Sequence, residues 1–345
     1  MKNNLEKLVR KNIQNLAPYS SAREEYTGTD GIFLDANENP FGIYNRYPDP
    51  YQNKLKQRLS EIKGIHQNQI FLGNGSDEII DLTYRIFCEP GKDKALTFSP
   101  TYGMYEVSAN INAVELIKLP LNNSFQMDRD SLQPFLLDES LKLIFICSPN
   151  NPTGNLIHSD DIEFIFRIFN GIVVIDEAYI DFCPQASFLD KLSAYPNLIV
   201  CQTLSKAWGL AGIRLGIAYM NEVVLTYFNK VKPPYNISSA NQYVALDALS
   251  NEADFQEKVN LILAEKERLS QELLQLSTVK KIYPSDANFL LVEVEDANDL
   301  YNKLVEKKLI IRNRNSVVKN CVRITIGTKE ENQQLLNALK EINHG

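Results

Sequence analysis

The sequence predicts an α/β fold, with a large domain whose mostly parallel sheet is flanked by helices and a smaller α+β domain after it. Three observations predict this fold. From about residue 70 to residue 220, short apolar runs bounded by turn residues alternate with helical patterns, which is typical of βα units. The runs at 142–147, 171–177 and 197–203 are continuously apolar, as expected for strands buried on both faces. After Ser238 a long helical pattern is followed by separated strands.

The length predicts more than one domain, because 345 residues, 44% of them hydrophobic, exceed what one small core usually holds. We expect an N-terminal arm over residues 1–40 that packs with the small domain. A large domain is expected over residues 41–240, and a small C-terminal α+β domain over residues 241–345.

The last third of the chain has its own order of elements. Helices are predicted at 255–276 and 296–308, and strands at 288–294 and 321–327. A final helix is predicted from Thr328, because Glu331 stands three residues later and completes a capping box. This mixture of helices and separated strands indicates an α+β lobe.

Charge, cysteine and histidine content exclude several classes of function. With 36 Lys and Arg against 43 Asp and Glu, the net charge is −7 and no basic block stands out, so we expect small-molecule substrates and no nucleic acid. The five cysteines are widely spaced without a C-x-x-C pair, which indicates a reduced, cytoplasmic protein. The three histidines lie far apart, so no metal is expected. No signal peptide is predicted, and no apolar stretch approaches the ~18 residues of a membrane span, so no membrane partner is expected.

Polar motifs follow three of the predicted strands. "SPNNPTG" follows the strand that ends at Cys147, "DEAY" ends the strand from Gly171, and "SK" follows the strand from Asn197. Open α/β sheets bind ligands outside the carboxyl ends of their strands. The sequence therefore predicts a ligand site at this edge of the sheet.

Lys206 stands in "TLSKAWGLAGIRLG", between a serine and small apolar residues, with Arg214 eight positions further on. A lysine that is shielded from water and near another cation has a lowered pKa, which makes its amine nucleophilic. An aldehyde cofactor such as pyridoxal phosphate needs this amine for a Schiff base, a carboxylate for its ring nitrogen and a nest for its phosphate. For an isolated lysine the alternative is a solvated surface side chain.

Asp176 is the candidate carboxylate, since it can stabilise the protonated ring nitrogen of such a cofactor. Its alternative role is a helix N-cap. Tyr179 and Asn151 could reach the phenolic oxygen, and Tyr102 is a candidate to stack on the ring, although core packing is the usual role of such a tyrosine.

The glycine-rich turn in "LGNGSDEII" precedes a helical pattern and is a candidate phosphate site. The turn can bring the backbone N–H groups of Ser76 and Asp77 to an anion at a helix N-terminus. Ser205 offers a hydroxyl, and Arg214 offers a fork for two phosphate oxygens. The alternative is a plain turn and N-cap. Glu78 stands where a dinucleotide fingerprint needs its third glycine.

The strand "CVRITIG" offers an anchor for the substrate. Val322, Ile324 and Ile326 take one face, so Arg323 points to the other. An arginine off the core face is commonly solvated. A face that looks into a cleft between the domains would instead make Arg323 and Arg312 a clamp for a carboxylate or a phosphate.

An ordered set of segments carries a resemblance to a known family. The segments are "LDANENPFG", "NRYPDPY", "FCEPGKD", "SPTYGMY", "CSPNNPTG", "DEAYIDFCPQAS", "TLSKAWGLAGIRLG" and "CVRITIGT". Together they resemble the aspartate aminotransferase superfamily of pyridoxal-phosphate enzymes, fold type I, and within it the histidinol-phosphate aminotransferase family. The similarity runs roughly from Leu16 to the last helix.

The resemblance implies pyridoxal 5'-phosphate as the cofactor of the large domain. It implies Lys206 as the Schiff-base lysine and Asp176 as the partner of the ring nitrogen, with Tyr179 also catalytic. The implied cofactor-binding positions are Tyr47, Ser76, Asp77, Tyr102, Asn151, Asp176, Tyr179, Ser205, Lys206 and Arg214. Those around the substrate are Tyr19, Asn37, Arg312 and Arg323.

The resemblance also implies a homodimer, because Tyr47 matches a tyrosine that reaches the neighbouring subunit's cofactor. Two positions depart from the family pattern: Trp208 stands where phenylalanine is expected, and Arg314 adds a cation close to Arg312.

The implied reaction is a ping-pong transamination through a lysine aldimine in histidine biosynthesis. It interconverts L-histidinol phosphate and 2-oxoglutarate with imidazole acetol phosphate and L-glutamate. An aromatic amino acid aminotransferase and a threonine-phosphate decarboxylase of the same fold are the alternatives. A non-catalytic regulator module would need a basic helix-turn-helix segment, for which the first 30 residues are too short and too weakly basic.

Overall fold

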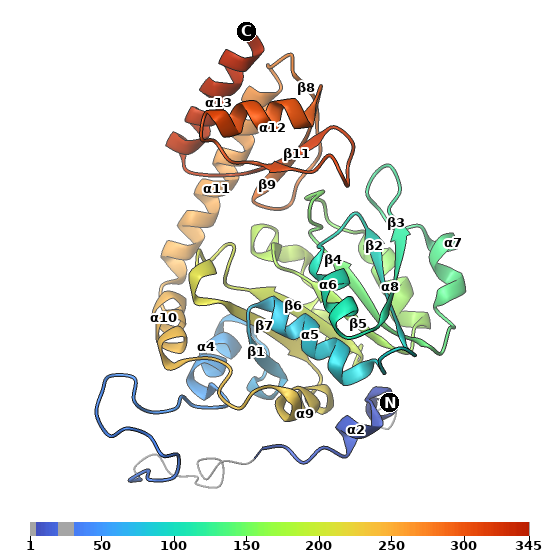
Figure 1. Ribbon diagram of the computed structural model, residues 1–345, viewed down its shortest axis with the longest axis vertical. Helices are drawn as coiled ribbons and strands as arrows, with labels where there is room; N and C mark the ends of the chain where they lie inside the picture. Colours follow the sequence, from blue (N-terminus) through green and yellow to red (C-terminus); the bar gives the residue numbers. More distant parts are fainter. Residues whose placement is uncertain (1–4, 20–30, 345) are drawn as a thin grey trace.

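The structure, a computed structural model, describes residues 5–19 and 31–344 and contains two sheets (Figure 1). The larger sheet has the order β1-β7-β6-β5-β4-β2-β3. Its strands are β1 (Ile70–Asn74), β2 (Lys94–Ser99), β3 (Glu115–Pro120), β4 (Leu141–Cys147), β5 (Ile172–Asp176), β6 (Leu198–Thr203) and β7 (Leu215–Met220). Strands β2 to β6 pair in parallel, and β7 is antiparallel to both β1 and β6. The predicted mostly parallel sheet is confirmed.

The strands at the centre of this sheet are buried on both faces, because alternate side chains enter two different cores. On β5, Val173 and Ile175 belong to one core, while Ile172 and Val174 belong to the other. The first core is closed by α4 (Asn53–Lys63), α8 (Ser159–Ile168) and α10 (Ser239–Leu249), and the second by α5 (Ser76–Phe87), α6 (Met104–Ile111) and α9 (Glu222–Val231). The continuous apolar runs of the sequence follow from this double burial.

The smaller lobe is a four-stranded antiparallel sheet of order β10-β11-β9-β8. Its strands are β8 (Val279–Ile282), β9 (Phe289–Val294), β10 (Arg312–Asn313) and β11 (Cys321–Thr325). Apolar side chains of α11 (Glu252–Leu273), α12 (Ala297–Glu306) and α13 (Lys329–His344) share one core with one face of this sheet. Figure 1 shows α11 running from the large lobe to the small one.

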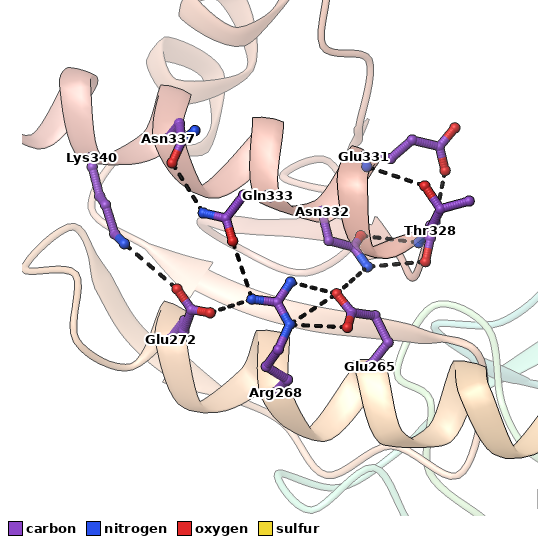
Figure 2. Close-up of polar contacts among 10 residues, drawn as sticks. Glu265, Arg268, Glu272, Thr328, Glu331, Asn332, Gln333, Asn337 and Lys340 are labelled. Carbon is purple, nitrogen blue, oxygen red and sulfur yellow. Dashed lines mark hydrogen bonds and ion pairs between the residues drawn. The ribbon is translucent and has the colours of Figure 1, made fainter.

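The start of α13 is fixed to α11 by the polar network drawn in Figure 2. The predicted capping box is present, since the N–H of Thr328 donates to Glu331 at 2.8 Å and the N–H of Glu331 donates to Thr328 Oγ1 at 3.2 Å. Asn332 donates to Glu265 of α11 at 3.1 Å and to the carbonyl of Gly327 at 3.0 Å. Because Gly327 follows β11, this network holds the end of the strand that carries Arg323.

The described part of the N-terminal arm differs from the expectation that it packs with the small domain. Leu5, Val9 and Ile13 are buried in a core of the large lobe, and the N–H of Arg10 donates to the carbonyl of Ile86 at 3.0 Å. The backbone leaves the helical conformation at Val9 and Arg10, between two short helical turns, and the three side chains pack in the same core as α9 and α5. The proposed domain boundaries remain predictions.

Two short α-helices also occur in the described chain, α2 (Lys11–Gln14) in the arm and α7 (Arg129–Leu132) before β4, besides several 3₁₀ turns. Within the described residues, no helix combines the length and the apolar character needed to cross a bilayer.

Candidate active site

A cavity of about 830 Å³ lies at the carboxyl ends of the central strands and is closed on one side by the small lobe. It brings together most of the predicted site residues: Ser76, Asp77, Tyr102, Asn151, Asp176, Tyr179, Ser205, Lys206, Arg214, Arg312 and Arg323. The strand order explains this gathering. Neighbouring β4, β5 and β6 are parallel, so the polar residues that follow them meet at one edge of the sheet.

Asp176 lies at the base of the cavity and is 3% exposed. Its Oδ2 accepts a hydrogen bond from the Tyr105 hydroxyl at 2.7 Å, and its Oδ1 accepts one from the Ala178 N–H at 3.1 Å. Burial raises the pKa of Asp176 to about 6, while these two hydrogen bonds act in the opposite direction. A helix cap does not account for Asp176, because only a 3₁₀ turn at Ile180–Phe182 follows.

Lys206 presents its amine to the same cavity. The side chain is accessible from the open cavity, but protein atoms of the cavity wall surround it. This partial burial lowers the pKa of Lys206, and the positive charge of Arg323 lowers it further. Its Nζ lies 5.8 Å from the centroid of the Tyr179 ring. An amine in this setting is a better nucleophile than a solvated lysine.

A chain of polar contacts connects the two lobes beside Lys206. Asn151 donates from Nδ2 to the Tyr179 hydroxyl at 3.3 Å, and Arg323 donates from Nη1 to Asn151 Oδ1 at 2.6 Å. The Tyr179 ring packs edge-on against Phe289 of β9, with the centroids 5.1 Å apart. Burial raises the pKa of Tyr179, so its hydroxyl stays protonated and can donate a hydrogen bond.

The glycine-rich turn and β7 form a narrow cradle at the start of α5. A Cβ added to Gly216 would lie 2.5 Å from the backbone of Gly75 and Ser76, and one added to Gly75, whose φ is +78°, would lie 2.6 Å from Arg214 Nη2. The Arg214 guanidinium is 3.6 Å from Asp77 Oδ2. Because the first N–H groups of a helix have no partner within the helix, this cradle can accept an anion.

The donor set fits the aldehyde cofactor expected from the sequence. The cavity offers an amine of lowered pKa at Lys206 and a buried carboxylate at Asp176. It also offers the Gly75 and Gly216 cradle, where only glycine leaves room beside Arg214. These three features match an aldehyde carbon, a protonated ring nitrogen and a phosphate, respectively.

Three predicted residues do not line this cavity in the single chain. Tyr19 is 68% exposed. Asn37 and Tyr47 line a separate pocket of about 450 Å³, where the Tyr47 ring stacks on Tyr235 with the centroids 4.5 Å apart. The roles predicted for these three residues stay predictions.

Sequence reasoning missed Tyr105, the tyrosine that donates to Asp176. Its only signal is its place three residues after Tyr102 in "SPTYGMYE", and the two rings pack edge to face, 5.7 Å apart. Arg314, one of the two departures from the family pattern, lines the cavity. The other departure, Trp208, stacks on Phe255 of α11 at 3.9 Å, and it does not line the cavity.

Comparisons with known proteins agree with this geometry. Residues 25–339 match the family described as aminotransferase class I and II. The histidinol-phosphate aminotransferase of Parabacteroides distasonis is 54% identical over 98% of this chain and 99% of its own, and that of Cytophaga hutchinsonii is 50% identical over 97% and 98%. Among solved structures, the histidinol-phosphate aminotransferase of Clostridium acetobutylicum has a TM-score of 0.81 at 25% identity, covering 90% of this chain and 98% of that one.

The aspartate aminotransferase of Thermus thermophilus shares the fold, with a TM-score of 0.74 at 19% identity over 87% of this chain and 83% of that one. The family match, the two close relatives and the shared fold all cover nearly the whole chain. The chain therefore belongs to the class I and II aminotransferase family, among the histidinol-phosphate aminotransferases.

Proposed function

We propose that the protein is a pyridoxal-phosphate-dependent transaminase of histidine biosynthesis that interconverts L-histidinol phosphate and 2-oxoglutarate with imidazole acetol phosphate and L-glutamate. The observation that carries this proposal is the single cavity that contains the Lys206 amine, the buried Asp176 carboxylate and the arginines of the small lobe. The names and the identities of the close relatives support the choice of substrate.

Each residue has a defined task in this reaction. Bound pyridoxal phosphate supplies an electron sink that makes the α-proton of an amino substrate acidic. Lys206 Nζ holds the cofactor and then moves a proton from the substrate's Cα, as general base and acid. Asp176 keeps a proton on the ring nitrogen, and the start of α5 with Ser205 and Arg214 binds the phosphate. Tyr102 packs over the ring.

The two amino substrates differ in their anionic groups, because glutamate carries carboxylates and histidinol phosphate carries a phosphate. We propose that Arg323 and Arg312 bind both anions in turn, since guanidinium forks accept either. Their position in the cavity supports this role. Arg323→Ala, measured in separate half-reactions, should slow both, and unchanged turnover with both substrates would remove the idea.

The proposal includes a homodimer in which Tyr47 reaches the neighbouring subunit's cofactor. Ile32, Leu34, Phe41 and Ile43 are between 82% and 92% exposed, an apolar segment that needs a cover. In Figure 1 this segment extends away from the large lobe. A cytoplasmic location is proposed as well, since all five cysteines are unpaired thiols, as in a reducing compartment.

A spectroscopic assay tests the function. The protein incubated with pyridoxal phosphate should gain a visible absorption band, which glutamate bleaches and imidazole acetol phosphate restores. Phenylpyruvate in place of imidazole acetol phosphate tests the aromatic aminotransferase, and carbon dioxide release from threonine phosphate tests the decarboxylase. A colourless protein would overturn the cofactor assignment, and a band restored by phenylpyruvate alone would overturn the substrate.

A further inference from the structure

Three arginines of the small lobe share one wall of the cavity. Arg312 of β10 lies directly opposite Arg323 of β11, and the N–H of Arg314 donates to the carbonyl of Cys321 on β11 at 2.9 Å. Side chains alternate along a strand, so Arg312 and Arg314 share a face. Asn313 turns away and donates to Asn298 of α12 at 2.8 Å.

The positive charges of these arginines are not balanced within the described residues. Neither Arg314 nor Arg323 has a carboxylate among the groups that shift its pKa, and burial followed by neighbouring arginines lowers the pKa of Arg314. The Nε atoms of both are buried without a hydrogen-bond partner. Glu293, on the same face of the sheet, accepts instead from the Tyr283 hydroxyl at 3.1 Å. Two like charges that face each other across a sheet are unfavourable, and so are buried donors without an acceptor. A multiply charged anion bound at this wall would relieve both, because it neutralises the charges and accepts hydrogen bonds.

We propose that Arg314 determines specificity by binding the third oxygen of a phosphate that Arg312 and Arg323 hold. This inference rests on the proposed function, because the phosphate belongs to the proposed substrate. A phosphate monoester has three terminal oxygens and nearly two negative charges, whereas a carboxylate has two oxygens and one charge. Two guanidinium forks satisfy a carboxylate, so a third contributes only when the phosphate is bound. Arg314 thereby lets one cavity distinguish histidinol phosphate from glutamate.

The variant Arg314→Gln, measured as holoenzyme in separate half-reactions, tests this role. The kcat/KM for histidinol phosphate should fall about 10- to 100-fold, as expected for the loss of one hydrogen bond to a charged group. The loss should lie in KM, because the phosphate is remote from the reacting carbon and is bound equally in the ground and transition states. The glutamate half-reaction should change by less than about twofold, since its carboxylates need only two forks.

Matched variants and a second probe complete the test. Lys319→Gln removes the same charge from an exposed position of the same loop and should change neither half-reaction. Arg314→Lys should recover part of the affinity, because it keeps the charge but loses the fork. Inorganic phosphate, titrated calorimetrically into the holoenzyme, should bind about tenfold more weakly to Arg314→Gln than to the unsubstituted protein.

The outcomes separate this inference from the function on which it rests. Equal losses in both half-reactions would mean that Arg314 acts through the fold, and no loss with histidinol phosphate would mean that it does not bind the phosphate. Either result overturns the inference. If the unsubstituted protein turns over neither substrate, the proposed function fails. If Arg314→Gln and the unsubstituted protein bind inorganic phosphate equally well, that result alone rejects the role of Arg314.

Discussion

Single side chains in the cavity are tuned by burial more than by direct ion pairs. The pKa of Asp176 rises to about 6 and that of Lys206 falls, because burial disfavours the charged form of each. Tyr105 limits the shift of Asp176 by donating to its carboxylate. Asp176 thus stays ionised at neutral pH, as a partner of a protonated ring nitrogen must.

The substitution Tyr105→Phe removes this donor, which should raise the pKa of Asp176 above about 6. Affinity for pyridoxal phosphate should fall about tenfold at pH 7, in keeping with a hydrogen bond to a charged group. Because the carboxylate is the binding form, affinity is lost as pH falls, and the loss should begin at a higher pH in the variant. Absorbance titration from pH 5.5 to 8.5 measures this, with Tyr195→Phe, in the core on the other face of the sheet, as the control. Equal affinities at every pH would contradict the role of Tyr105.

Glu177, the neighbour of Asp176, predicts a pH dependence of stability. Burial raises its pKa from 4.5 to about 7, although it accepts hydrogen bonds from Phe188 N–H, Gln202 and Ser187. The folded state therefore binds this proton more tightly than the unfolded state does. The stabilisation is complete below pH 4.5 and is lost as pH rises through about 7, a change of about 3 kcal/mol.

Glu177→Gln should remove most of this dependence, since glutamine does not titrate. The free energy of unfolding, measured by urea at fixed protein concentration between pH 4.5 and 7.5 without cofactor, should fall less steeply than in the unsubstituted protein. Asp176 has a raised pKa as well and leaves a smaller slope. Two identical slopes would refute the assignment.

At the scale of elements, the proposed phosphate cradle depends on how closely β7 approaches the turn between β1 and α5. Gly73 of β1 pairs with Gly216 of β7, and the N–H of Gly75 donates to the carbonyl of Arg214 at 2.8 Å. Arg214 itself has a φ of +52°, which turns its side chain back over the start of α5. The cradle therefore depends on β1, β7 and the start of α5. The sequence indicates the glycine-rich turn and Arg214, but not the close approach of Gly216 to that turn.

Gly216→Ala should damage this cradle, because its Cβ would meet the backbone of Gly75 and Ser76 at 2.5 Å. Overpacking of this kind costs about 1–3 kcal/mol, and the displaced N–H groups should weaken cofactor binding at the same time. Urea unfolding and cofactor titration measure the two effects. Gly212→Ala is the control, since nothing lies within 4 Å of its added Cβ. A Gly216→Ala protein as stable as the control would contradict the close approach.

For the whole molecule, the cavity is closed on one side because the two lobes meet. The hydrogen bond from Arg323 to Asn151 is one link, and the N–H of Asp286 donates to the carbonyl of Gly154 at 2.7 Å as another. The segment around Ile32 and Ile43 is apolar and exposed in the single chain. In the proposed homodimer, a second copy would cover this segment and Tyr47 would serve the cavity of the neighbouring chain.

Mixing two inactive variants tests the contribution of Tyr47 across the interface. Lys206→Ala lacks the amine, and Tyr47→Phe lacks the hydroxyl but keeps the ring that stacks on Tyr235. After subunit exchange, a hybrid dimer holds one site with both groups, so activity should return to about a quarter of that of the unsubstituted protein. A tyrosine acting within its own chain would restore nothing, and sedimentation verifies that hybrids have formed.

The sequence by itself determined the fold class and the members of the central site. Double burial requires continuous apolar strands, and parallel strands end at one edge, so Asn151, Asp176 and Lys206 could be placed together from local patterns alone. The alternation in "CVRITIG" likewise put Arg323 off the core face of its strand, as β11 shows. These properties follow from the apolar pattern within each strand and from the parallel direction of neighbouring strands.

Only the tertiary structure decided what depends on segments far apart in the chain. The hydrogen bond from Tyr105 to Asp176 joins residues that are 71 positions apart in the sequence, and the one from Arg323 to Asn151 joins residues that are 172 positions apart. The first turns of the arm lie on the large lobe because their apolar side chains share a core with α9, which no local pattern of the arm reveals. Contact between elements sets burial, and burial sets the pKa values. The pairing of β10 with β11 leaves the Arg314 Nε atom buried without a hydrogen-bond partner among the described residues.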